Sequence, residues 1–124
     1  RKMFELTING TVYEFNFGIG FVKEINKMVQ KPVDGVPGIK EDMGLTFAIA
    51  KIIDGDVVTL INVLDMANKG KDPRITKAML EEYVDDEDTD IDGLFDQVMG
   101  FFRRSNATKK TVQKITDAVM NAEN

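Results

Sequence analysis

MFELTINGTVYEFNF, residues 3–17, is the stretch that decides the fold of this 124-residue chain. Asn9-Gly10 divides it into two runs in which apolar and polar residues alternate. That dipeptide is typical of a two-residue type I′ turn, because both central positions need a positive φ. We therefore predict a β-hairpin over these residues, with Phe4 opposite Phe15.

The predicted hairpin has one apolar face and one polar face. Leu6 and Tyr13 pair on the apolar face, whereas Glu5 stands opposite Glu14 on the other face, an arrangement that requires water. A two-stranded hairpin is marginally stable alone, so its apolar face must pack on helices. Its two edges remain open and could pair with another chain.

Apolar residues at helical spacing predict three helices after the hairpin. The first ends before Pro32, the second runs from a capping Asp42 to Gly55, and the third from Asp56 to about residue 69. Between the first two, residues 31–40 carry two prolines and two glycines and predict a long loop. The inward stripes expected for the three helices are Ile19, Val22, Ile25, Met28 and Val29; Met43, Phe47, Ile49, Ala50 and Ile53; and Val57, Leu60, Ile61, Leu64 and Ala67.

Three more helices are predicted in the second half of the chain. They begin at Thr76, at Thr89, which forms an apparent capping box with Asp92, and at Thr108. Their inward stripes are Leu80, Tyr83 and Val84; Ile91, Leu94, Phe95, Val98 and Phe102; and Val112, Ile115, Val119 and Ala122. The sequence thus predicts one α+β domain over residues 1–124, an N-terminal β-hairpin (residues 3–17) packed on a bundle of five to six α-helices (residues 18–122).

The composition excludes several classes of function. The chain contains no cysteine and no histidine, which excludes disulfides, Cys/His zinc sites and Ser-His-Asp triads. Its net charge of −5 argues against a general nucleic-acid binder, and no apolar run reaches the about 18 residues of a membrane span. We expect a cytoplasmic protein that is not an enzyme and holds no cofactor or metal.

Charge is unevenly distributed along the chain. Residues 81–96 contain nine acids and no base, whereas residues 97–124 contain five bases and two acids. One interpretation is a solvated acidic loop. The other is that the acidic and basic segments meet head to tail between subunits, or dock a charged partner.

Asp88-Thr-Asp-Ile-Asp-Gly93 matches the first six positions of an EF-hand calcium loop. The twelfth position, which should hold a bidentate glutamate, is Met99. The helical stripe from Ile91 to Phe102 would also be interrupted by such a loop. A helix N-terminus accommodates Asp90 and Asp92 without a metal, so a calcium site is not the favoured interpretation.

The helix expected to begin at Thr89 carries the candidate partner-binding residues. Phe101 beside Phe102 widens its apolar stripe beyond one core face, and methionine suits adaptable binding surfaces. If one ring is exposed, it marks a partner groove; if both are buried, they are core. The candidate partner-binding residues are therefore Phe95, Met99, Phe101 and Phe102.

Four segments carry a resemblance to a known family. They are residues 4–10 (FELTING), 13–26 (YEFNFGIGFVKEIN), 86–95 (DEDTDIDGLF) and 106–110 (NATKK). In this order they resemble the tail assembly chaperones of siphophages and prophages of Gram-positive bacteria, and the likeness covers most of the chain.

The resemblance implies a helper in building the phage tail. Such proteins bind the tape measure protein, a long, largely helical and aggregation-prone chain, keep it soluble and help recruit tail tube subunits. They act in the host bacterial cytoplasm and are absent from the mature virion. In many such phages a translational frameshift adds a C-terminal extension that contacts the major tail tube protein, and this chain would be the unshifted form.

Other functions remain open beside the chaperone. A structural tail-completion component of the virion would be found in purified particles. A calcium-binding interaction module would hold a metal at Asp88, Asp90 and Asp92. Open strand edges or opposite charge patches could also allow self-association.

Overall fold

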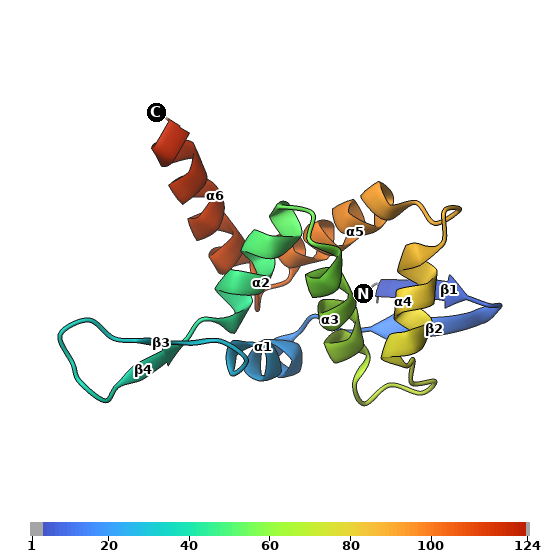
Figure 1. Cartoon of the computed structure of the whole chain (residues 1–124), viewed down its shortest axis with the longest axis horizontal. Coiled ribbons are helices and arrows are strands. Elements are labelled where there is room, and N and C mark those ends of the chain that lie inside the picture. Colours follow the sequence, from blue (N-terminus) through green and yellow to red (C-terminus); the bar gives the residue numbers. More distant parts are fainter. Residues whose placement is uncertain (1–3, 124) are drawn as a thin grey trace.

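In a computed structural model of the chain, residues 4–123 are described, and they form two antiparallel hairpins and six α-helices (Figure 1). The elements in chain order are β1 (Phe4–Ile8), β2 (Thr11–Phe15), α1 (Ile19–Asn26), β3 (Gln30–Pro32), β4 (Lys40–Asp42), α2 (Gly44–Ile53), α3 (Val57–Asn68), α4 (Lys77–Asp85), α5 (Ile91–Arg104) and α6 (Lys109–Glu123). The prediction of an α+β fold with an N-terminal hairpin and about six helices is confirmed.

The β1–β2 hairpin has the predicted register, with Phe4 paired with Phe15 and Leu6 with Tyr13. Asn9 and Gly10 both have positive φ, 54° and 79°, as a type I′ turn requires. Alternate residues of β1 are buried and exposed. The turn therefore fixes which side chains enter the core.

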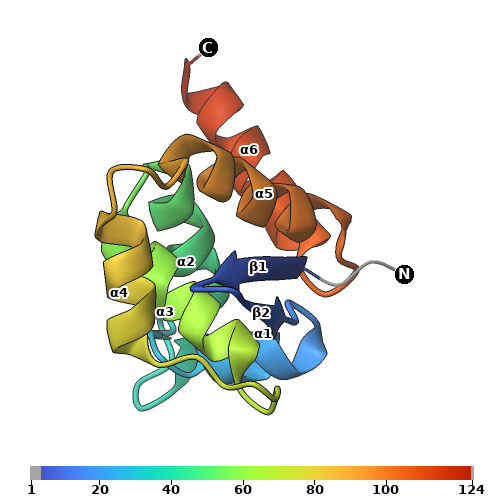
Figure 2. The same cartoon turned by 90° about the vertical axis from the view of Figure 1, so that its right-hand side faces the viewer.

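The core lies between this hairpin and the surrounding helices. Figures 1 and 2 place the hairpin at one end of the body, with α3 and α4 on one side of it and α5 on the other. Aromatic rings join the hairpin to α1 and α5, because Phe17 contacts both Phe21 and Phe102 edge to face, with ring centroids 5.2 and 5.3 Å apart. Such pairs add about 0.5–1.5 kcal/mol each beyond burial.

Residues 31–40 are not simply a loop, as the sequence predicted. Their ends pair as β3 and β4, with Lys31 opposite Glu41, and the N–H of Val33 donates to the carbonyl of Ile39 (2.9 Å). Both strands are exposed, and the hairpin projects away from the body (Figure 1). The prolines and glycines indicated a turn correctly, but strands of three residues are too short to show the alternation of apolar and polar residues that predicts a strand.

The predicted start of α2 was wrong. Asp42 belongs to β4, and the position before α2 is Met43, whose side chain makes no capping bond. The cap comes from another helix, since Oδ1 of Asn26, at the end of α1, accepts a hydrogen bond from the N–H of Leu45 (3.0 Å). A long-range cap of this kind has no local sequence signature.

The faces of α1 and α2 also differ from the prediction. Ile19 and Met28 are exposed, and Phe21 is buried instead. On α2 the expected inward residues Phe47, Ala50 and Ile53 are exposed, while the buried stripe is Leu45, Ala48, Ile49 and Ile52. The reason is a close approach of α2 to α1, where a Cβ on Gly44 would collide with the carbonyl of Ile25. This contact sets the rotation of α2.

The later helices follow the prediction more closely. Asp56 and Thr76 cap α3 and α4 through their side chains. The cap of α5 is Asp90, whose Oδ1 accepts from the N–H of Gly93 (3.0 Å), and not Thr89. The Thr89 hydroxyl instead donates to the carbonyl of Tyr83 (2.6 Å).

The helix α6 packs only through its first half. Val112 is buried and Ile115 is partly buried, but Val119 and Ala122, expected to face inward, are exposed. Figure 1 shows the reason, because α6 continues beyond α2 and away from the body. Thr108, just before α6, is fully buried and donates its hydroxyl to the carbonyl of Phe102 (2.6 Å), which ties the two helices together. Within residues 4–123, no helix is both long and apolar enough to cross a lipid bilayer.

Candidate partner-binding groove

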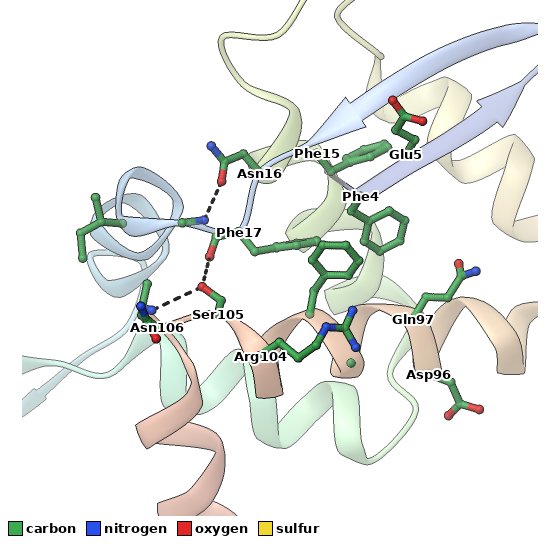
Figure 3. Close-up of a pocket in the computed structure, with 15 residues that line it drawn as sticks. Phe4, Glu5, Phe15, Asn16, Phe17, Asp96, Gln97, Arg104, Ser105 and Asn106 are labelled. Carbon is green, nitrogen blue, oxygen red and sulfur yellow. Dashed lines mark hydrogen bonds between the residues drawn. The ribbon is translucent and has the colours of Figure 1, made fainter. Parts of the chain in front are cut away.

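A groove of about 1180 Å³ separates the β1–β2 hairpin from α5 (Figure 3). One wall is the start of β1, with Phe4 and Glu5. The other wall is a single face of α5, formed by Asp96, Gln97, Gly100, Phe101 and Arg104. These positions follow the three- and four-residue steps that align side chains along one side of a helix. We call this feature the β1–α5 groove.

The floor of the groove is aromatic. Phe101 is half-buried, with its ring centroid 5.1 Å from that of Phe4 and 6.2 Å from that of Phe17. Phe4 and Phe17 are almost completely buried. Phe101 is therefore the ring through which this cluster reaches the surface of the groove.

Arg104 lies along the α5 wall above this ring. Its guanidinium carbon is 4.9 Å from the centroid of Phe101, within the range of a cation–π contact. The guanidinium also passes over Gly100, where an added Cβ would lie 3.1 Å from it. Among residues 4–123 no acidic side chain forms a salt bridge with Arg104. The groove thus contains a cation whose donors are available to a partner.

Short polar contacts close the end of the groove near α1 (Figure 3). The Ser105 hydroxyl donates to the carbonyl of Phe17 (3.3 Å) and accepts from the N–H of Ala107 (3.3 Å). The N–H of Gly18 donates to Oδ1 of Asn16 (2.9 Å). The bond from Ser105 to Phe17 joins the hairpin exit to the end of α5, and the other two bonds order the segments on either side of it.

The structure separates the four residues predicted for partner binding. Phe101 lines the groove. Phe102 and Met99 are core residues, with exposed fractions of 0% and 6%. Phe95 is partly buried against the core and does not line the groove. The sequence left open whether one ring of the Phe101–Phe102 pair is exposed, and the answer is that Phe101 is partly exposed.

Sequence reasoning missed the other wall of the groove. Phe4 and Phe17 were assigned only to the apolar face of the hairpin or left without a role. No local pattern shows that α5 stops short of β1, because the spacing of these elements depends on the packing of the whole core. The open strand edge noted from the hairpin was the available signal.

A smaller and strongly acidic hollow of about 370 Å³ lies at the tip of the same hairpin. Its acidic lining residues are Glu82, Asp86, Asp88 and Asp90. Two of these carboxylates already accept hydrogen bonds from nearby backbone N–H groups. Asp90 caps α5, and Oδ1 of Asp86 accepts from the N–H of Asp88 (2.9 Å). Throughout residues 4–123, no three acidic side chains gather closely enough to hold a metal ion.

Other apolar side chains are exposed away from the groove. Phe47 on α2 is 50% exposed, with the Lys51 ammonium 5.8 Å from its ring centroid. Val58 at the start of α3 and Met120 on α6 are also exposed. Val57 and Val119, the neighbours of the last two, are exposed as well, but none of these residues lines the β1–α5 groove.

Comparison with protein families gives one match. The family model described as phage tail assembly chaperone protein, TAC, matches residues 5–117. Comparison with curated proteins and with solved structures gave no match. The matched range includes the α5 wall of the β1–α5 groove and Glu5 of its β1 wall, begins one residue after Phe4, and continues through the first half of α6. The chain belongs to the phage tail assembly chaperone (TAC) family.

Proposed function

We propose that this chaperone binds the tape measure protein, keeps it soluble during tail assembly and helps recruit tail tube subunits around it. Membership of the family supports a phage tail protein as the partner. The observation that carries the proposal is the β1–α5 groove, in which a half-buried aromatic ring lies beside an arginine that forms no salt bridge within residues 4–123. Aromatic and arginine side chains are the commonest anchors of protein interfaces.

A noncatalytic role agrees with the composition of the chain. Without cysteine or histidine, the groove offers carboxylates, an arginine, side-chain amides and the hydroxyl of Ser105 as polar groups. Such a surface recognises a chain by shape, apolar contact and charge. We further propose that the protein acts in the host cytoplasm and is absent from the mature virion, as family members that assist assembly would be.

Two additional partners belong to the same proposal. A frameshifted C-terminal extension would follow α6 and contact the major tail tube protein. Self-association is the second, and the outer half of α6 offers exposed Val119 and Met120 for it. Several weakly bound copies along one client would gain from multivalency.

The direct test is co-expression of the chain with a fragment of the tape measure protein from the same phage. We expect soluble fragment that co-elutes with the chaperone, and insoluble fragment without it. Phe101→Asp should abolish co-elution. Phe47→Asp is the control, because Phe47 is also a phenylalanine beside a cation but is more exposed than Phe101 and lies on α2 outside the groove. A fragment that stays insoluble with the unmodified chain contradicts the proposal.

The competing structural role makes a different prediction. A tail-completion component remains in purified phage particles, whereas an assembly chaperone does not. Mass spectrometry of particles purified after lysis therefore separates these roles. Stoichiometric presence of this chain in the particles would rule out the chaperone proposal.

A further inference from the structure

The outer edge of β1 carries unpaired backbone groups. In a hairpin closed by a two-residue turn, the residues flanking the turn exchange hydrogen bonds, and every second pair does so after that. Ile8, Leu6 and Phe4 therefore bond to β2, while the N–H and C=O groups of Glu5 and Thr7 point away from it. Among residues 4–123 no hydrogen bond reaches these outward groups.

The opposite edge of the hairpin has the geometry that this alternation predicts, and most of it is covered by α3. The same alternation directs the backbone groups of Glu14 and Asn16 outward from β2. The carbonyl of Glu14 does accept from Nδ2 of Asn68 (2.9 Å), and the N–H of Asn16 donates to the carbonyl of Ala67 (2.8 Å). The end of α3 therefore covers the β2 edge at Glu14 and Asn16 and leaves it open at Val12, beside the turn, whereas no described element covers the β1 edge at Glu5.

The open edge borders the β1–α5 groove. Figures 1 and 2 both show β1 as the strand nearer α5, and Glu5 lines the groove beside Phe4. A chain lying in the groove would have the edge of β1 on one side and the apolar and charged face of α5 on the other. Strand addition to an exposed sheet edge has this arrangement, in which main-chain bonds give affinity and pockets select side chains.

Two charges on the α5 wall of the groove define the chemistry of an occupant. Arg104 stands at one end of the α5 wall and Asp96 at the other (Figure 3). Neither has a salt-bridge partner within the described part of the chain. Between them, Phe101 presents an apolar surface. A complementary segment carries a carboxylate next to Arg104, an apolar side chain over Phe101 and a base next to Asp96.

We propose that the β1–α5 groove binds an extended segment of the client as a third strand, paired through the backbone groups of Glu5. The inference rests on the proposed client binding and specifies its conformation. A helical segment satisfies its own backbone groups and leaves those of Glu5 unpaired. An extended segment pairs with them and also covers the exposed part of Phe101.

The experiment uses short overlapping synthetic peptides that cover the tape measure protein of the same phage, titrated into the full chain. We expect bound peptides to share the acidic, apolar and basic order derived above. In an NMR hydrogen-exchange measurement, the Glu5 amide should become protected on binding, whereas the Val12 amide on the other strand should not.

Two variants test the mode of binding. Glu5→Pro removes the outward N–H without breaking a bond to β2, and proline is tolerated at such edge positions. It should weaken peptide binding about tenfold or more, which corresponds to about 1.4 kcal/mol. Val12→Pro is the matched control, since it makes the same change on the edge of β2 outside the groove. Gln97→Trp fills the groove from α5 and should also block binding without altering β1.

The outcomes separate this inference from the proposed function. If Gln97→Trp and Glu5→Pro still solubilise the tape measure fragment and bind peptides as the unmodified chain does, the strand-addition site is wrong and the chaperone function stands. A peptide that binds as a helix, or without protecting Glu5, also overturns it. Failure of the unmodified chain to solubilise any fragment instead overturns the proposed function.

Discussion

The side chain of Asn68 donates from Nδ2 to the main-chain carbonyl of Glu14 over 2.9 Å, although 54 positions separate the two residues. Asn68 is completely buried at the end of α3, and its Oδ1 accepts from the N–H of Ile75 (2.7 Å) and from Arg74 (3.0 Å). One amide thus covers the β2 edge at Glu14 and anchors the segment before α4. The Glu14 carbonyl is therefore occupied, whereas within residues 4–123 the outward groups of Glu5 on the β1 edge remain open to a partner.

Replacement of Asn68 should therefore destabilise the protein strongly. Asn68→Ala leaves the buried N–H of Ile75 without an acceptor, and we expect a loss of about 2–4 kcal/mol in the free energy of unfolding. Urea denaturation measures this loss. Asn62→Ala is the control on the same helix, because Asn62 is only partly buried and its side chain makes no hydrogen bond within the described residues; its cost should stay below about 0.5 kcal/mol.

The contact between α1 and α2 makes a second pair of variants informative. Gly44→Ala places a methyl group against the carbonyl of Ile25, so the two helices must move apart, and we expect a loss of about 2 kcal/mol or more. Gly20→Ala lies on α1 with open space around it and should stabilise the protein by about 0.5–1 kcal/mol. Thermal unfolding should show changes of opposite sign. Equal effects would contradict the close approach of the helices.

The cap of α3 should make stability depend on pH. The hydroxyl and the N–H of Thr59 both bond to the Asp56 carboxylate and lower its pKa below the ordinary value. Because the folded-state pKa is the lower one, the ionised cap stabilises the fold above the unfolded-state pKa of about 3.9, and this stabilisation is lost as the pH falls through the folded-state pKa.

The measurement is the difference in Tm between the unmodified chain and Asp56→Asn, followed from about pH 7 to about pH 3. The difference should shrink at the acidic end, since the variant has no carboxylate to protonate. Thr59→Val removes the largest cause of the shift and should raise the pKa of Asp56, which NMR titration reports directly. An unchanged pKa in that variant would refute the assigned cause.

The sequence predicted the parts of the fold that depend on local geometry. Asn9-Gly10 determined the hairpin register because the turn leaves only one pairing. Asp56 and Thr76 were recognised as helix starts, and the structure shows that each caps its helix through a backbone N–H three residues away. The predicted buried face of α2 was wrong because the rotation of this helix depends on the contact of Gly44 with α1 and on a cap from Asn26. Neither feature has a local sequence signal.

The candidate site was predictable only in part for the same reason. The Phe101–Phe102 pair indicated surplus apolar surface on α5, but the period of one helix cannot show which ring meets the hairpin. Phe4 and Arg104 join the groove from positions 100 residues apart in the sequence. Their proximity is a consequence of how the aromatic core packs, and no spacing rule predicts it.

The difference between Phe101 and Phe102 provides the last prediction. Phe102 is fully buried and contacts Phe17 and Phe21, so Phe102→Ala should cost about 3–5 kcal/mol. Phe101→Ala removes a half-buried ring and one cation–π contact, so we expect a loss of about 1–2 kcal/mol.

Client binding should be weakened more by Phe101→Ala than by Phe102→Ala at a temperature where both variants are folded, because of the two rings only that of Phe101 lines the groove. Urea denaturation and co-elution with the tape measure fragment measure the two quantities on the same samples. Equal stability losses would make Phe101 a core residue, and full client binding by a folded Phe101→Ala chain would remove this ring from the proposed interface.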